Sequence, residues 1–187
     1  MKVTVVYFGG QYNHLILKLL KNLGIDATSI EPTVKPEDIN TDCLILGGGP
    51  YSVYQDLDKM GYAKEYITKL SIPIMGVCLG HELIAHVLGG VVRKAEKPEY
   101  GLTEIHIIKE DTLFRNLPRK LVVWESHSDE VIKEPQGFEV IAYSESAKIQ
   151  AMVNEDKGFY SVQFHPEVKH TQHGVEIYKN FLSVCRR

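Results

Sequence analysis

Short apolar runs alternate with segments of helical periodicity through the first half of the chain. The runs that predict buried strands are residues 3–8, 27–30, 43–46 and 72–77. Between them, apolar residues recur every three or four positions, which predicts amphipathic helices over residues 15–23, 61–70 and 79–88. Strands that alternate with helices in this way are typical of a parallel sheet covered by helices on its faces.

The second half of the chain has a different pattern, in which strand-like runs follow one another directly. These runs are residues 103–108, 121–124, 138–144, 149–153 and 159–164, and a closing helix is predicted over residues 175–184. We therefore predict an α/β fold of three layers, with an open, mostly parallel sheet covered by helices and an additional, partly antiparallel sheet. No repeat, linker or change of composition divides the sequence, so residues 1–187 are expected to form a single domain.

Composition and charge narrow the classes of function. The chain is 44% hydrophobic and 24% charged, as in ordinary globular proteins. Its net charge of -3 does not indicate the broad positively charged surface that binds nucleic acid or an anionic membrane. No apolar stretch approaches the roughly 20 residues of a membrane span, and the apolar start is too brief for a signal peptide. Cys43, Cys78 and Cys185 are far apart and odd in number, which argues against a disulfide framework and a zinc site. We expect a reduced, cytoplasmic protein.

Three glycine-rich turns follow predicted strands, at residues 9–10, 47–49 and 76–80. The carboxyl ends of parallel strands form the edge of a sheet at which ligands bind. The third turn reads GVCLG, the cysteine counterpart of a serine nucleophile elbow. The helix that begins there points its N-terminal N–H groups at the sulfur, which is expected to lower the pKa of the Cys78 thiol. The alternative is a buried cysteine in a packed strand–helix unit.

The segment QFHPEV, residues 163–168, offers a base for this thiol. His165 and Glu167 lie on either side of Pro166, and residues two apart in an extended segment project to the same side. Glu167 can then orient the imidazole, as the third member of a catalytic triad does. The alternative is a solvated loop histidine.

The turn GGGP, residues 47–50, has two interpretations. It is either an ordinary tight turn or a stretch of backbone without side chains that lets an N–H group approach the reaction centre. In the second case, the backbone N–H groups of Gly49 and Leu79 would together form an oxyanion hole.

The motifs GVCLGHELIA, FYSVQFHPEV and LILGGGP resemble those of the class I, triad-type glutamine amidotransferases, over nearly the whole chain. The resemblance implies a flavodoxin-like sheet and hydrolysis of glutamine by Cys78, His165 and Glu167 through a γ-glutamyl thioester. It also implies an oxyanion hole from the amides of Gly49 and Leu79.

By the same resemblance, other residues of the site would bind glutamine or a partner. Glu82 would accept from the α-ammonium of glutamine, and Ser128 and Asp129 would contact its main-chain groups. His127 and Asp129 would belong to the surface that faces a partner.

Further segments, GGQYNHLI, PEYG, VWESHSDEV and HPEVKHTQHGVEIYKNF, resemble the glutaminase part of GMP synthetases. Because the sequence ends at Arg187, the resemblance is to the separate glutaminase subunit of two-subunit enzymes, an arrangement typical of archaea. It implies an ATP-pyrophosphatase partner that holds ATP and magnesium and converts XMP to GMP, with no metal or cofactor in this chain. Two alternatives remain: a glutaminase subunit of an anthranilate or aminodeoxychorismate synthase, and a catalytically silent regulatory subunit.

The sequence departs from the family pattern near the predicted nucleophile. Glu82 stands where glutamine is usual, Ser128 replaces the glycine of SHGD, and YFGGQ replaces DNGGQ. A carboxylate at Glu82 would bind an ammonium group strongly but would oppose ionisation of Cys78. Alternatively, Glu82 points to solvent from its helix. Ser128 is denied backbone conformations that only glycine adopts freely.

Overall fold

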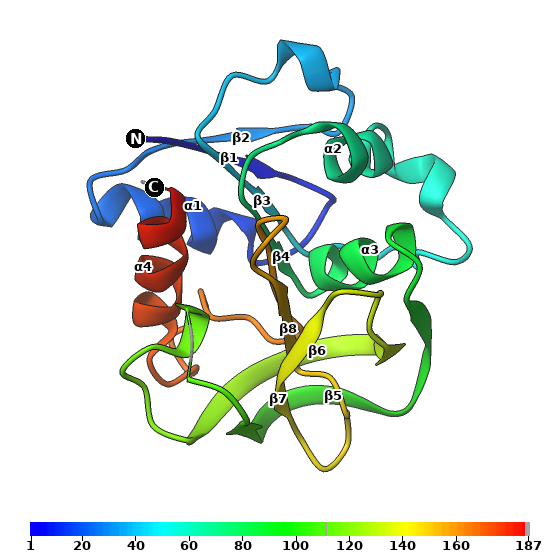
Figure 1. The fold of residues 1–187 in the computed structure, drawn as a ribbon, viewed down its shortest axis with the longest axis vertical. Helices are drawn as coiled ribbons and strands as arrows, with labels where there is room; N and C mark the ends of the chain where they lie inside the picture. Colours follow the sequence, from blue (N-terminus) through cyan, green and yellow to red (C-terminus); the bar gives the residue numbers. More distant parts are fainter. Residues whose placement is uncertain (111, 186–187) are drawn as a thin grey trace.

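The structure is a computed structural model that describes residues 1–110 and 112–185. Its strands form one nine-stranded sheet in the order β2-β1-β3-β4-β9-β8-β7-β5-β6 (Figure 1). The parallel part consists of β1 (Lys2–Val6), β2 (Asp26–Ile30), β3 (Cys43–Leu46), β4 (Ile74–Val77) and β9 (Phe159–Val162). The antiparallel part consists of β5 (Val91–Ile107), β6 (Lys120–Lys133), β7 (Glu139–Tyr143) and β8 (Ala151–Asn154).

The predicted α/β class is confirmed, with one change in how the sheet is built. The antiparallel strands do not form an additional sheet, because β8 pairs with β9 and so continues the parallel part. Strands β5 and β6 are also much longer than their apolar runs suggested. Most of residues 91–102 are exposed or half-buried, so this part of β5 has no apolar run to mark it in the sequence.

Helices cover both faces of the parallel strands (Figure 1). α1 (Asn13–Asn22) and α4 (Gly174–Cys185) lie on one side, and α2 (Ala63–Lys69) and α3 (Leu79–Val87) lie on the other. Along β3, Ile45 packs into the core beneath α1 and α4, whereas Leu44 and Leu46 pack toward α2 and α3. Burial on both faces explains why these strands appear as continuous apolar runs rather than as alternating ones.

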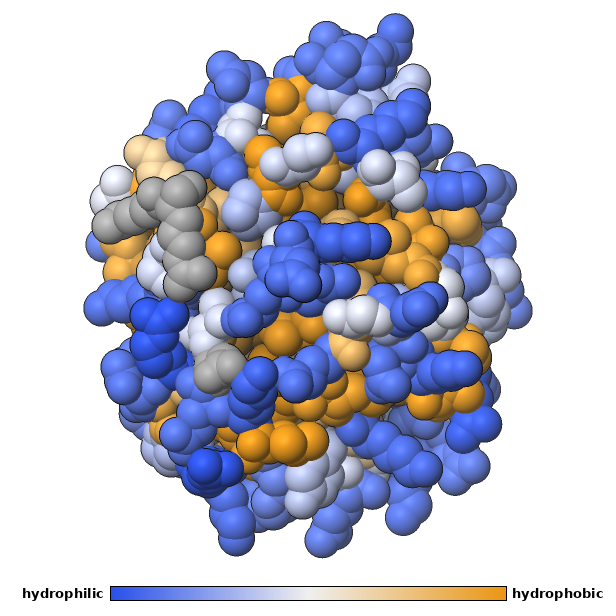
Figure 2. Space-filling model, in the orientation of Figure 1, coloured by the Kyte–Doolittle hydropathy of each residue, from blue (hydrophilic) through white to orange (hydrophobic). Residues whose placement is uncertain are grey.

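Short 3-10 helices occupy some of the connections, at Pro36–Asp38, Leu57–Met60 and Thr112–Phe114. Polar side chains dominate the visible face of the molecule, with apolar side chains showing between them (Figure 2). Within the described part of the chain, no helix has both the length and the apolar character that a membrane crossing requires.

Cys43 and Cys185 form a disulfide, with Cα atoms 5.8 Å apart, so the expectation that the cysteines remain unpaired is wrong for these two. Cys43 begins β3 and Cys185 ends α4, and the two lie 142 positions apart in the sequence. Spacing along the sequence gave no sign of the bond because the docking of α4 on the sheet brings the two residues together. By the chain-entropy estimate, closing a loop of this length stabilises the fold by about 5 kcal/mol.

Candidate active site

A cavity of about 410 Å³ opens where the parallel strands β1, β3 and β4 end. The parallel register brings the turns that follow these strands to one edge of the sheet, as predicted. The cavity is lined by all of the predicted site residues except Leu79, namely Gly49, Cys78, Glu82, His127, Ser128, Asp129, His165 and Glu167.

Cys78 occupies a sharp turn between β4 and α3. Its backbone has φ 55° and ψ −103°, a left-handed conformation that costs free energy for any residue with a side chain. A Cβ atom on Gly76 would lie 2.5 Å from the carbonyl of Gly80, and one on Gly80 would lie 2.1 Å from the carbonyl oxygen of Leu46. A side chain at either position would clash with backbone atoms, so both flanking residues must be glycine, as the elbow interpretation predicted.

The thiol of Cys78 lies between two polar groups that the sequence did not point to. Sγ donates a hydrogen bond to the backbone carbonyl of Ser126 at 3.5 Å, and the Gln163 amide nitrogen lies 3.9 Å from Sγ. Cys78 is only 6% exposed, so the sulfur is reached through the cavity alone. Ser126 is on β6 and Gln163 directly follows β9, so the thiol is enclosed by both the parallel and the antiparallel parts of the sheet.

The pKa of the Cys78 thiol is raised well above its usual value, contrary to the expected lowering. Burial is the main cause, and the carboxylates of Glu82, Glu125 and Glu167 add to it. The backbone N–H of Leu79, at the start of α3, does act to lower the pKa as predicted, but it does not outweigh these effects. At neutral pH Cys78 is therefore a thiol, which fits its donation to a carbonyl.

His165 and Glu167 form a buried pair, with Nδ1 and Oε2 2.6 Å apart. The predicted contact is present, but its geometry differs from the extended segment that we expected. Pro166 and Glu167 lie in a turn closed by the Val168 amide donating to the His165 carbonyl at 3.3 Å. The other oxygen of Glu167 accepts from the hydroxyl of Tyr178 on α4 at 2.9 Å, which fixes the carboxylate from a second side.

The glycine turn after β3 adjoins both Cys78 and His165. A Cβ atom on Gly48 would lie 3.2 Å from Cε1 of His165 and 3.8 Å from Cβ of Cys78. A Cβ atom on Gly49 would lie 2.9 Å from the Leu79 side chain, so this turn packs against the first residue of α3. The two predicted oxyanion donors, Gly49 and Leu79, are therefore neighbours.

Glu82 is buried at the first turn of α3, so the alternative that it points to solvent is wrong. Its Oε2 accepts from the amide of Gln163 at 2.8 Å, and the same amide lies beside the Cys78 sulfur. Burial raises the pKa of Glu82 to about 8. At neutral pH Glu82 is predominantly in its protonated, neutral form. A protonated carboxyl group has both a hydrogen-bond donor and an acceptor, as a glutamine side chain does.

Ser128 and Asp129 lie on β6 at the wall of the cavity. Ser128 is exposed and has no positive φ, so it does not need the backbone freedom of the glycine that it replaces. The carboxylate of Asp129 accepts from the hydroxyl of Tyr54 at 3.0 Å.

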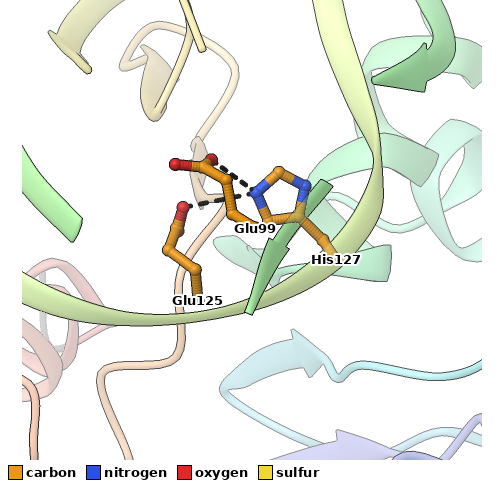
Figure 3. A group of neighbouring side chains, drawn as sticks. All are labelled: Glu99, Glu125 and His127. Atoms are coloured by element: carbon orange, nitrogen blue, oxygen red, sulfur yellow. Dashed lines mark hydrogen bonds and ion pairs between the residues drawn. The ribbon is translucent and has the colours of Figure 1, made fainter. Parts of the chain in front are cut away.

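The side chain of His127 does not lie on the surface, contrary to the expectation that it faces a partner. It is buried against Glu99 of β5 and Glu125 of β6, and these three side chains form a compact group (Figure 3). His127 Nε2 lies 2.8 Å from Glu99 Oε1 and 3.3 Å from Glu125 Oε2, and Nδ1 lies 2.6 Å from the Asp129 carbonyl. Burial opposes the imidazolium, but the two carboxylates outweigh it and raise the pKa of His127 to about 10.

Among the described residues, these three side chains are the group that could supply ligand atoms to a metal ion. One potential ligand atom from each lies within 4.8 Å of the others. Hydrogen bonds already account for the arrangement, because Gln150 also donates to both carboxylates, at 3.3 and 3.0 Å. An imidazolium that donates from both nitrogens has no lone pair for a metal. Sequence spacing gave no signal for this group, since strand register pairs Glu99 with His127.

The fold and the site define a class of protein, and comparison with known proteins agrees with it. The model of the class-I glutamine amidotransferase family matches residues 4–185, and the chain belongs to this family. The chain is 57% identical to one subunit of the glutamine-hydrolysing GMP synthase of Sulfolobus acidocaldarius, over the full length of both. The same identity and coverage are found for the corresponding subunit from Sulfurisphaera tokodaii.

A solved structure is also similar over the whole chain. It is a crystal structure described as that of a candidate GMP synthase subunit from Thermoplasma acidophilum, with a TM-score of 0.94 and 36% identity. The match covers 100% of this chain and 94% of that one.

Proposed function

We propose that this chain is the glutaminase subunit of a two-subunit GMP synthase. It hydrolyses glutamine to glutamate and ammonia, and a separate ATP-pyrophosphatase subunit uses the ammonia to convert XMP to GMP. The observation that carries the proposal is the buried His165–Glu167 pair, which adjoins Cys78 across Gly48 in a single cavity. The relatives named as subunits of glutamine-hydrolysing GMP synthases support the choice of synthase.

The first half of the reaction forms the thioester. Glu167 holds the proton on Nδ1 of His165, which leaves Nε2 as the acceptor for the thiol proton. Because burial keeps Cys78 protonated, the proton moves to His165 as sulfur bonds to the carboxamide carbon. The amides of Gly49 and Leu79 stabilise the resulting oxyanion. His165 then protonates the departing nitrogen, and ammonia leaves behind a γ-glutamyl thioester.

The second half of the reaction releases glutamate. Water gives a proton to His165 and attacks the thioester carbon, and collapse of the second oxyanion breaks the carbon–sulfur bond. The proton returns from His165 to sulfur, so the Cys78 thiol is restored. None of these steps uses a metal or a cofactor of this subunit, and ATP and magnesium are assigned to the partner.

Glu82 provides the prediction that separates this site from one with glutamine at the same position. We propose that Glu82 binds the α-ammonium group of glutamine. The backbone at Ser128 and Asp129 would bind the other main-chain groups of the substrate. Free Glu82 keeps its proton up to about pH 8, so binding of the ammonium group must displace that proton. The KM for glutamine is therefore expected to fall as the pH rises from about 6 to about 8, by up to about tenfold per unit.

The matched variant is Glu82→Gln, which has no proton to lose. Its KM is expected to be constant over the same pH range, as measured by glutamate release in the presence of the partner. If KM has the same pH dependence in both proteins, Glu82 does not bind the ammonium group.

The mouth of the cavity has a feature suited to a partner. Tyr100 lines the cavity and is 70% exposed, and tyrosine is enriched at protein interfaces. A partner that covers this mouth would receive ammonia before it mixes with bulk water. We place both subunits in the cytoplasm, a compartment in which a structural disulfide such as Cys43–Cys185 is uncommon.

Reconstitution tests the proposal. The chain is mixed with a GMP synthase ATP-pyrophosphatase subunit, XMP, ATP, magnesium and glutamine, and GMP is measured. Glutamine-dependent GMP formation, absent without this chain, is the expected result. A complex that forms instead with a chorismate-using synthase and supplies it with ammonia would overturn the choice of synthase. Failure to hydrolyse glutamine with either partner would indicate the silent regulatory subunit.

A further inference from the structure

Trp124 holds the backbone of His165 at both of its polar groups. The Trp124 carbonyl on β6 accepts from the His165 amide at 2.9 Å. The Trp124 amide donates to the Thr171 hydroxyl at 2.9 Å, and that hydroxyl donates to the His165 carbonyl at 2.8 Å. The position of the His165 main chain, three residues after the end of β9, is therefore set by β6.

The indole of Trp124 reaches the imidazole of His165 through a second residue. Its Nε1–H donates to the hydroxyl of Tyr12 at 3.0 Å. The Tyr12 ring contacts the His165 ring at a centroid distance of 4.9 Å and an interplanar angle of 66°. Tyr12 precedes α1 and lines the cavity, so this contact comes from the opposite end of the sequence.

His165 needs this second contact because one hydrogen bond does not fix a ring. The bond from Nδ1 to Glu167 restrains the imidazole at one edge, and small tilts of the ring about that edge remain possible. The side-chain torsion next to the ring has a broad energy minimum and adds little resistance. A neighbouring ring held against the imidazole removes that freedom, and a misplacement of about 1 Å can cost roughly a hundredfold in rate.

We propose that Tyr12 and Trp124 form a positioning unit for His165. The indole N–H fixes the Tyr12 hydroxyl, and the Tyr12 ring then holds the imidazole in the orientation that proton transfer with Cys78 requires. The inference rests on the proposed function, because orientation matters only where His165 is the base.

The test uses Trp124→Phe, Tyr12→Phe and the double variant in complex with the synthetase subunit, with glutamate release measured at saturating nucleotide. Each single variant deletes one end of the same hydrogen bond and keeps an aromatic ring. Each is expected to lower kcat about tenfold with KM within about twofold. The double variant is expected to be no slower than either single variant, because the bond is lost only once. Rates are divided by the fraction of Cys78 that a glutamine-analogue electrophile labels.

A loss of orientation is expected to act on the chemical step and not on substrate binding. In both single variants kcat/KM should therefore fall by the same factor as kcat. Tyr143→Phe serves as the control, because Tyr143 stacks on His106 and does not line the cavity. Its kcat and KM are expected to match those of the parent chain.

The other outcomes each overturn a different statement. An unchanged kcat in either single variant, losses that multiply in the double variant, or a loss that falls on KM instead of kcat would overturn the positioning unit. His165→Asn is measured in the same assay. If His165→Asn keeps full activity, the proposed base itself is wrong, whereas its loss of activity beside unaffected Tyr12 and Trp124 variants overturns the positioning unit alone.

Discussion

Replacing Cys78 with alanine is expected to lower glutamine-dependent GMP formation by about 10⁴-fold or more. The variant loses the atom that forms the thioester, and the described part of the chain has no other free cysteine. Alanine is smaller than cysteine and has no polar atom to leave unpaired, so the fold is expected to persist. The measurement is the rate of GMP formation by the reconstituted complex with saturating glutamine.

The control for Cys78→Ala is the same complex supplied with ammonium salt in place of glutamine. Ammonia bypasses the glutaminase, so the rate of GMP formation from ammonia is expected to equal that of the parent complex. Retention of more than a tenth of the glutamine-dependent rate would contradict the assignment of Cys78. A loss of the ammonia-dependent rate as well would indicate that the complex did not assemble.

Replacing Glu167 with glutamine is expected to lower kcat by roughly 10⁴-fold, the loss seen when the orienting acid of a serine-protease triad becomes an amide. The side chain keeps its shape, but its nitrogen cannot accept the proton on Nδ1 of His165. An amide that rotates its oxygen toward His165 turns its nitrogen toward the Tyr178 hydroxyl and disturbs that contact instead. The measurement is kcat for glutamate release in the complex.

Tyr178→Phe is the matched control for Glu167→Gln. It removes the second hydrogen bond to the carboxylate but leaves the charge and the bond to His165 in place. Its kcat is expected to fall by about tenfold or less, since only one oxygen of Glu167 is freed. Equal losses in the two variants would mean that Glu167 acts through the packing of α4 and not through the imidazole.

The parts of the site that could be predicted from the sequence are those in which neighbours along the chain act together. The glycines around Cys78 are of this kind, because the sharp turn leaves no room for side chains. His165 and Glu167 are as well, because two residues so close in the sequence can contact each other directly. The family and its triad motifs followed from the same short segments. Secondary-structure periodicity gave the layers of the parallel sheet, because strands buried on both faces carry apolar runs.

The parts that could not be predicted depend on strand register or on helix docking. Ser126 on β6 contacts Cys78, 48 positions earlier in the sequence, and Glu99 contacts His127 through the pairing of β5 with β6. The disulfide between Cys43 and Cys185 depends on where α4 docks. None of these pairs shares a spacing that a linear motif could contain.

The pKa of Cys78 was wrongly predicted for a related reason. The start of α3 was visible in the sequence, and it does act to lower the pKa. The degree of burial was not visible, and burial dominates. Glu82 illustrates the same point, because the burial that raises its pKa to about 8 also removes most of its charge at neutral pH. The carboxyl beside the thiol is therefore a weaker obstacle to catalysis than its ionised form would be.

Covalent capture tests the central claim, that Cys78 is the nucleophile of a glutaminase, most directly. The complex, loaded with XMP, ATP and magnesium, is treated with the glutamine analogue diazo-oxo-norleucine, and the labelled peptide is located by mass spectrometry. Cys43 and Cys185 are joined in a disulfide and serve as internal controls. The account predicts one adduct, on Cys78, with loss of glutamine-dependent GMP formation in proportion to labelling. Full labelling at another residue, or complete inactivation with Cys78 unmodified, would contradict it.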